Sequence, residues 1–179
     1  MNIDVEPLQT ERIYLIVPHL DNSSIIAESI KKSKHHLRPW LRWANNDYDQ
    51  EKIKKMILAY RDLLLAKEQF MYYMWLKNTK DFIGAITLRN INWNLKTAEL
   101  GYWLDSDYVG KGYMQEAIKY IIKYAFTVLT LNSLIAFTYA DNIRSRKALE
   151  KCEFTFECEV INSESRKVAI YKYEGGEVK

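Results

Sequence analysis

The distribution of hydrophobic positions along the chain changes its period several times, and each period predicts one kind of element. Apolar residues at helical spacing predict helices, whereas alternation or short apolar runs between polar turns predict strands. The helices are expected at residues 23–33, 49–67, 114–126 and 142–151. The strands are expected at residues 11–17, 69–77, 81–91, 96–105, 133–139, 154–161 and 167–174.

This order predicts an α+β domain with a mixed, mainly antiparallel twisted sheet flanked by helices. The three strands between residues 69 and 105 are separated by polar turns, which favours an antiparallel meander. The strand–helix–strand unit at 97–139 adds at least one parallel pair, because a helix connects its strands. The aromatic and basic segment KHHLRPWLRWANND contains Pro39 and is not expected to form one regular helix.

The clearest helical pattern follows a pair of glycines, and the best alternating strand precedes them. The helix is expected to bury Met114, Ala117, Ile118, Ile121, Ile122, Ala125 and Phe126. One face of the strand is expected to carry Ala98, Leu100, Tyr102 and Leu104, and the other face Glu99, Gly101, Trp103 and Asp105. The connection VGKGYM therefore lies where a strand leads into a helix.

Length and composition restrict the class of protein. The 179 residues suit a single domain, expected at 1–174, followed by a flexible tail at 175–179. The net charge of +3 suits an anionic ligand and does not indicate a nucleic-acid partner. No segment resembles a signal peptide or a transmembrane helix, which predicts a cytoplasmic protein without a membrane partner. A homodimer is compatible with the sequence, which does not define the oligomeric state.

The two cysteines are expected to be free thiols in a reducing compartment. Cys152 and Cys158 have neither metal-ligand nor CxxC spacing, so no metal site is predicted from them. Neighbouring histidines at 35 and 36 point in different directions in any regular element, which argues against a metal pair. The sequence therefore predicts no metal cofactor.

The loop VGKGYM concentrates two of the six glycines, Gly110 and Gly112, on either side of Lys111. A helix start presents unpaired N–H groups and the positive end of the helix dipole, and glycine lets further backbone approach a ligand. This combination suits a phosphate or pyrophosphate, although an ordinary loop that enters a helix has the same composition. The phosphate-binding patterns GxxxxGK[ST] and GxGxxG are both absent.

The order of several motifs extends the argument beyond this loop. ELGYWLDSDYVGKGYMQEA, followed by a strand and DNIRSRKALEKCEF, resembles the GNAT superfamily of acetyl-CoA-dependent N-acetyltransferases. The chain looks most like the branch that acetylates the N-termini of ribosomal proteins. TERIYLIVP, HHLRPWLRWAN and DFIGAITLRN also occur in the expected order, so the resemblance covers almost the whole chain. It departs from the family loop pattern at Val109, where Arg or Gln is usual, and at Met114, where Gly or Ala is usual.

The resemblance implies a GNAT-like sheet in which two strands splay apart to hold acetyl-CoA. Trp103, Leu104 and Asp105 would pair with the pantetheine arm, although sheet packing explains the first two equally well. The loop amides would bind the pyrophosphate, with the Lys111 side chain either attracting phosphate or lying in solvent. Asn142 would approach the CoA arm or simply cap its helix. The implied cofactor set is Trp103, Leu104, Asp105, Val109, Gly110, Lys111, Gly112, Tyr113, Met114 and Asn142.

Acetyl transfer to an amine requires removal of a proton and stabilisation of the carbonyl oxygen as it becomes negative. Glu99 is the candidate base, directly or through a water, unless it is a surface glutamate paired with a lysine. Leu149 replaces the tyrosine that many family members carry, so Ser145 is the candidate acid or a small residue that lets the cofactor approach. The N–H of Leu104 or Asp105 is a candidate oxyanion donor by analogy. Direct attack on the thioester requires no cysteine nucleophile.

The resemblance also implies that the segment HHLRPWLRWANN faces the acceptor amine. The candidate contacts are His36, Arg38, Trp40 and Trp43. The tryptophans are more often core or loop anchors than ligand contacts. The arginine is either a partner for acidic groups of a protein substrate or equally a solvated side chain.

Three functions remain open at this level. The first is an acetyl-CoA-dependent N-acetyltransferase that acts on the α-amine of a protein or peptide, with a ribosomal protein as the expected acceptor. The second is an N-acetyltransferase of a small-molecule amine such as a polyamine or an aminoglycoside, because this fold family changes acceptors freely. The third is a CoA-binding module without catalysis, which the missing tyrosine allows.

Overall fold

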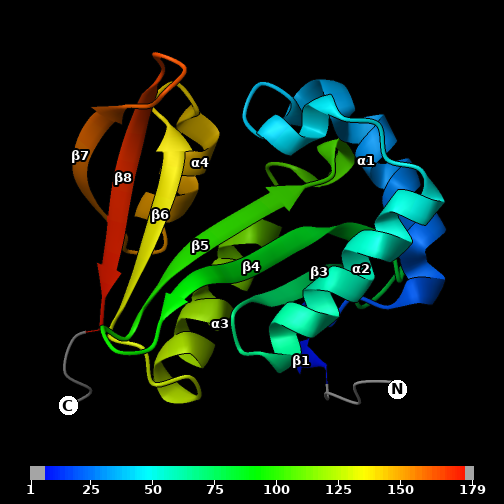
Figure 1. Ribbon diagram of the computed structural model, residues 1–179, viewed down its shortest axis with the longest axis horizontal. Helices are drawn as coiled ribbons and strands as arrows, with labels where there is room; N and C mark the ends of the chain where they lie inside the picture. The colour runs from blue at the N-terminus through cyan, green and yellow to red at the C-terminus, as the bar shows by residue number, and fades with distance from the viewer. Residues whose placement is uncertain (1–6, 176–179) are drawn as a thin grey trace. The chain divides into compact units, whose positions relative to one another are not determined.

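The computed structural model describes residues 7–175, shown in Figure 1. The helices are α1 (Ser23–Leu37), α2 (Gln50–Leu65), α3 (Tyr113–Thr127) and α4 (Ile143–Glu150), and the 3-10 turns are η1 (Leu20–Asn22), η2 (Arg42–Asn45) and η3 (Ser106–Tyr108). The strands are β1 (Leu8–Gln9), β2 (Ile13–Ile16), β3 (Phe70–Leu76), β4 (Phe82–Asn92), β5 (Thr97–Leu104), β6 (Ser133–Tyr139), β7 (Thr155–Ile161) and β8 (Lys167–Glu174). They form one sheet in the order β1-β2-β3-β4-β5-β6-β8-β7. The predicted α+β class with a mixed, mainly antiparallel sheet is confirmed.

The contacts divide the described residues into two compact units. The first unit contains the chain up to Thr87 together with Tyr102–Tyr113. The second unit contains Leu88–Gly101 and the chain from Met114 onwards. Strands β4 and β5 each contribute residues to both units.

The core of the first unit lies between two helices and the sheet strands that they cover. Strand β2 pairs antiparallel with β1 and β3, with Ile13 opposite Leu76. Helices α1 and α2 pack against each other, and in Figure 1 α2 lies across β3. Their apolar stripes face the strands because burying that surface stabilises the fold. The buried cluster consists of Ile26, Ala27, Ile30, Ile53, Ile57, Tyr73, Trp75, Phe82 and Ala85.

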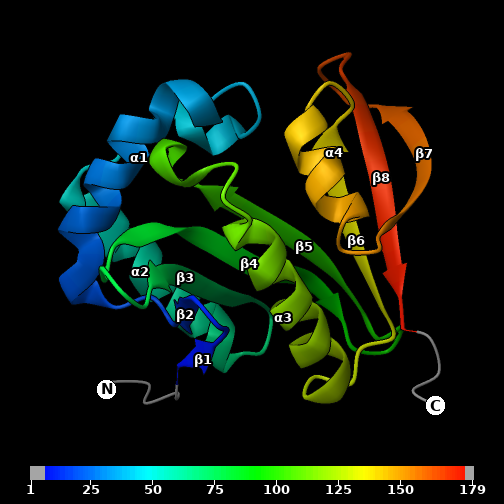
Figure 2. The ribbon, with the colours of Figure 1, turned by 180° about the vertical axis from the view of Figure 1, so that it is seen from behind.

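The second unit is built on a parallel pair that continues into an antiparallel hairpin. Residues 97–100 of β5 pair in parallel with 133–136 of β6, and β6 and β7 each pair antiparallel with β8. Helix α4 packs against β6 and β7, and Figure 2 shows it from behind, beside β6. Helix α3 buries Met114, Ala117, Ile118, Ile121, Ile122 and Ala125. Six of the seven positions expected to face the core are therefore buried, and Phe126 is half-buried.

The larger differences between the expected and observed elements lie in the N-terminal part of the chain, and the bounds of the expected elements from α2 onwards agree within two residues. Helix α1 continues to Leu37, four residues beyond the predicted end, because Pro39 limits the helix only from that point. Strand β2 starts at Ile13 instead of residue 11, since the N–H of Ile13 donates to the Thr10 hydroxyl at 3.1 Å and closes a turn. The expected tail lies outside the described residues except for Gly175, whose N–H donates to the Asn132 carbonyl at 3.2 Å.

Two neighbouring residues of α2 provide a test of the first core. Ile57 is 0% exposed within the buried cluster, whereas Leu58 is 48% exposed. We expect Ile57→Ala to lower the free energy of unfolding by about 2–5 kcal/mol, because it removes buried methyl groups and leaves a cavity. Leu58→Ala should cost less than about 1 kcal/mol. Urea unfolding followed by circular dichroism measures both, and equal losses would contradict this placement of the core.

Candidate functional site

The loop between β5 and α3 has the backbone of an open anion cradle. Gly110 and Gly112 adopt positive φ angles of 78° and 80°, a region that glycine enters without steric cost. A Cβ atom at Gly110 would meet no atom of the described residues within 4 Å, so the backbone is open to a ligand there. Helix α3 begins at Tyr113, and the first N–H groups of a helix have no partner within it. The loop therefore fits a pyrophosphate-sized anion bound by backbone amides.

The carboxylate of Asp105 anchors the start of this loop within the first unit. Its side chain is 1% exposed, and Oδ2 accepts hydrogen bonds from the Ser29 hydroxyl at 2.6 Å and from Lys32 Nζ at 2.9 Å. Oδ1 accepts the N–H of Asp107 at 3.0 Å and so caps η3. These contacts position the loop. Direct contact between residue 105 and CoA stays a prediction.

The end of β5 distinguishes the two candidate oxyanion donors. The N–H of Asp105 donates to the Ile83 carbonyl at 2.9 Å, which ties it to β4. Successive N–H groups of a strand point to opposite sides, so the N–H of Leu104 points away from β4. Strands β4 and β5 also approach each other closely here. A Cβ atom added at Gly84 would collide with the Trp103 carbonyl oxygen. Leu104 is therefore the better candidate donor, and its role stays a prediction.

The lysines around the loop are bound to the loop itself. Lys111 Nζ donates to the Asp107 carbonyl at 2.9 Å and lies 5.2 Å from the centre of the Tyr108 ring. Lys32 Nζ donates to the Asp107 carboxylate at 2.8 Å and thereby lowers the pKa of Asp107. Partial burial lowers the pKa of Lys32, but hydrogen bonds to Asp107 and Asp105 outweigh it and raise that pKa overall. Attraction between Lys111 and a phosphate stays a prediction.

In the second unit Asn142 caps α4. Its Oδ1 accepts the N–H of Ser145 at 3.2 Å, which confirms the capping role that the sequence allowed. Arg146 donates to the Tyr171 hydroxyl and to the Ala140 carbonyl, both at 3.0 Å, and so ties the first turn of α4 to β8 and the preceding loop. Ser145 is half-buried on this fixed turn. Contact of Asn142 or Ser145 with CoA or the acceptor stays a prediction.

Both carboxylate oxygens of Glu99 accept hydrogen bonds within the second unit. Oε1 accepts from Nε of Arg89 at 2.9 Å and from its Nη2, and Oε2 accepts from the Asn90 amide at 2.7 Å. The Glu99 side chain is 13% exposed, so it is neither a surface glutamate nor paired with a lysine in these contacts. A carboxylate oxygen has two lone pairs. The arrangement thus orients Glu99 and is compatible with its predicted role as a base.

Three candidate acceptor contacts lie where α1 ends. His36 is in the last turn of the helix, and Arg38 is its C-cap. The N–H of Trp40 donates to the Leu37 carbonyl at 2.9 Å in the turn that follows. Arg38 is exposed, while His36 and Trp40 are half-buried. Contact between these side chains and an acceptor stays a prediction.

Trp43 is part of the aromatic packing of the first unit. Its ring lies edge-on to Tyr48 and Trp103, with ring centres 5.8 Å and 5.7 Å apart. Both Trp43 and Trp103 pack against the buried cluster. The anchoring role that the sequence allowed for Trp43 and the packing role of Trp103 are therefore confirmed. A role of either ring in ligand binding stays a prediction.

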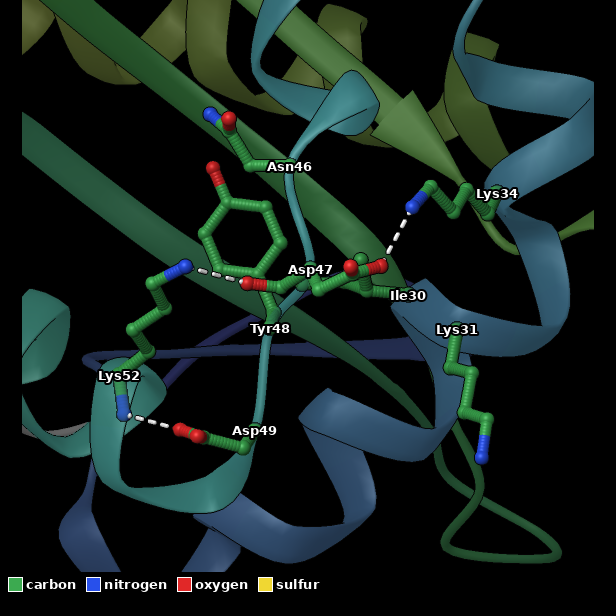
Figure 3. A pocket seen from close by; sticks show the side chains of 8 residues that line it. All are labelled: Ile30, Lys31, Lys34, Asn46, Asp47, Tyr48, Asp49 and Lys52. Carbon is green, nitrogen blue, oxygen red and sulfur yellow. Dashed lines mark hydrogen bonds and ion pairs between the residues drawn. The ribbon is translucent and has the colours of Figure 1, made fainter.

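A pocket of about 320 Å³ lies beside this segment, between α1 and the start of α2 (Figure 3). Lys34 Nζ lies 2.5 Å from Asp47 Oδ1, and Lys52 Nζ donates to the Asp47 carbonyl at 2.7 Å. The four candidate acceptor contacts are not among the lining residues. The pocket is lined by Ile30, Lys31, Lys34, Asn46, Asp47, Tyr48, Asp49 and Lys52.

Neither cysteine is arranged as a nucleophile or a ligand in the described structure. Cys152 is buried, and this burial raises the pKa of its thiol to about 11, so the thiol is protonated at neutral pH. Cys158 is exposed on β7, and both cysteines are free. Residues 7–175 contain no cluster of three or more His, Cys, Asp or Glu side chains suited to a metal ion. No helix within this range is long and apolar enough to cross a membrane.

Sequence reasoning missed several residues that hold the loop. Ser29 and Lys32 bind Asp105 from α1, and Arg12 binds the carbonyl of Lys111 from the start of β2. The spacing of Ser29 and Lys32 places them on one face of a helix. No local signal pairs either residue with position 105, so only the structure identifies the contact.

Comparison with known proteins gives a consistent result. A family model described as "Acetyltransferase (GNAT) domain" matches residues 15–155. The chain is 33% identical over 112 residues to "Probable N-acetyltransferase YjcK" of Bacillus subtilis (strain 168), a match that covers 62% of each protein and thus less than two thirds of the relative. It is 26% identical over 141 residues to the ribosomal-protein-serine acetyltransferase of Escherichia coli (strain K12), covering 79% of this chain and 66% of that protein.

The fold is shared with a solved structure. RimL, a ribosomal L7/L12 alpha-N-protein acetyltransferase in complex with coenzyme A, superposes with a TM-score of 0.88 at 20% identity. The match covers 94% of this chain and 98% of RimL. At this identity the likeness establishes the fold.

Two aspartates that share Lys32 provide a test of the loop anchor. Asp105→Ala removes a buried acceptor of three hydrogen bonds, and we expect a loss of about 1–3 kcal/mol in the free energy of unfolding. Asp107→Ala removes an exposed partner of the same lysine and should cost much less. Denaturant titrations of both variants make the comparison. Equal losses would mean that Asp105 is not the anchor.

Proposed function

Because the chain belongs to the GNAT acetyltransferase family, we propose that it transfers an acetyl group from acetyl-CoA to the α-amine of a protein or peptide. The expected acceptor is the N-terminus of a ribosomal protein. The observation that carries this proposal is the open glycine loop at the start of α3, within a chain whose family model spans residues 15–155. The names of the Escherichia coli relative and of RimL support the choice of acceptor.

The residues present fit acetyl-CoA as a co-substrate. The amides of residues 109–114 would hold the pyrophosphate, because Gly110 and Gly112 adopt positive φ angles and the space beside Gly110 is open. Val109 has no side-chain donor, so binding there rests on the backbone. The end of β5 would bind the pantetheine arm. Asn142, at the start of α4, is a further predicted contact of CoA. When bound, acetyl-CoA supplies an activated acetyl group.

Two side chains are proposed for the proton transfers. Glu99 accepts the proton of the acceptor amine, directly or through a water, while Arg89 and Asn90 hold its carboxylate in one orientation. Ser145, in the first turn of α4, delivers a proton to the departing thiolate and regains one from solvent. The N–H of Leu104 would stabilise the carbonyl oxygen as it becomes negative. No covalent enzyme intermediate is proposed, since the Cys152 thiol is buried and protonated at neutral pH.

The acceptor class is tested by measuring CoA release with a thiol reagent. Purified protein and acetyl-CoA are combined with peptides that begin with Ser or Ala, with the same peptides blocked at the α-amine, and with polyamines and aminoglycosides. We expect saturable release only with the free peptides. Release of CoA with the small amines alone would indicate an N-acetyltransferase of small-molecule amines. Tight binding of acetyl-CoA without turnover of any amine would indicate a CoA-binding module.

The role of Glu99 is tested by the pH dependence of the rate. An α-amine has a pKa of about 8, so the need for a base is greatest at low pH. We expect Glu99→Gln to lower the rate about 100-fold or more near pH 6.5, with a smaller deficit near pH 9. Glu157→Gln, on exposed β7, is the matched control and should have the same rate at each pH as the unmodified protein. A parallel pH profile for Glu99→Gln would remove Glu99 as the base.

A further inference from the structure

Arg12 contacts the glycine loop from the other end of the chain. It directly precedes β2, and its carbonyl accepts the N–H of Lys77 at 2.9 Å, so its backbone is held at the end of β3. Its Nη1 donates to the Lys111 carbonyl at 3.1 Å. Its Cζ lies 4.6 Å from the centre of the Tyr113 ring. One guanidinium therefore touches both the loop and the first residue of α3.

The hydrogen bond to Lys111 restrains a single peptide plane. The carbonyl of Lys111 and the N–H of Gly112 belong to the same peptide unit. In a planar trans peptide these two bonds point in opposite directions. When Arg12 holds the carbonyl on one side, the Gly112 N–H is presented on the other side.

This restraint matters because the surrounding backbone is unusually free to rotate. Gly110 and Gly112 flank the residue whose carbonyl is held, and glycine exchanges between φ regions at little cost. The Lys111 ammonium is directed to the Asp107 carbonyl, and Val109 carries an apolar side chain. Arg12 adds a charge-assisted donor to this peptide, and such hydrogen bonds are about twice as strong as neutral ones.

We propose that Arg12 is a positioning residue that orients the Gly112 N–H toward the pyrophosphate of CoA. This inference rests on the proposed function, because it takes the loop to be the CoA site. Arg12 acts through the peptide plane and not as a direct partner of the phosphates. Its effect on affinity should therefore persist at high salt, whereas a direct charge contact with phosphate would be screened.

Calorimetric titration with CoA tests this role without relying on activity. Arg12→Met keeps an apolar stem near Tyr113 and removes the donors. We expect its CoA affinity to fall about tenfold, by the same factor at about 0.1 M and about 0.5 M KCl. Arg12→Lys restores a donor and should recover most of the affinity. Lys55→Met removes an exposed charge from α2 and should bind CoA as the unmodified protein does.

The ligand-free protein provides a second readout. The NMR signals of the Gly112 amide and the Lys111 carbonyl carbon should shift or broaden in Arg12→Met and return in Arg12→Lys. Thermal unfolding first establishes that the variants fold, and Arg12→Gln, which is too short to reach the carbonyl, replaces the Met variant if needed.

Three results would overturn the inference: unchanged CoA affinity in Arg12→Met, a defect that disappears at high salt, or undisturbed Gly112 and Lys111 signals. Failure of the unmodified protein to bind CoA would instead reject the proposed function, so the two failures are distinguishable.

Discussion

The buried carboxylate of Asp105 is the interaction on which the site depends, because it joins α1 to the strand end that begins the glycine loop. A buried charge is tolerated only when it is paired and hydrogen-bonded. Ser29 and Lys32 supply these contacts from α1, and the N–H of Asp107 supplies another from the loop. Since α1 is itself fixed by the apolar cluster of the first unit, the rigidity of the core extends to the loop.

The glycine loop combines free rotation within it and restraint at both ends. Gly110 and Gly112 provide a backbone that can adopt positive φ angles, but flexible amides would lose entropy on binding a ligand. Asp105 restrains the start of the loop, and Arg12 restrains the Lys111–Gly112 peptide near its end. The same logic applies in the second unit, where Arg89 and Asn90 orient Glu99. The loop and the Glu99 carboxylate are thus each held by hydrogen bonds to neighbouring side chains.

Several elements followed directly from local pattern. The period of α3, the alternation of β5 over residues 97–100 and the bounds of β6 agree with the structure, because each depends on residues only a few positions apart. Beyond residue 100 the burial of β5 no longer alternates. Helix α1 was predicted too short, since its last turn carries the polar residues 34–36 and is completed by burial of Leu37. The capping role of Asn142 was one of two readings that the sequence allowed, and the hydrogen bond to Ser145 confirmed it.

By itself, the sequence determined the periodic elements, the position of the glycine loop and the resemblance to the GNAT family. Only the tertiary structure decided the partners that hold the site. The Arg12–Lys111 contact spans 99 positions and the Ser29–Asp105 contact spans 76. Local periodicity indicates which face of each element is exposed to water and which is buried in the core. It contains no information on which distant polar groups form hydrogen bonds. That pairing is decided by the packing of the helices and strands, which brings these groups within hydrogen-bonding distance.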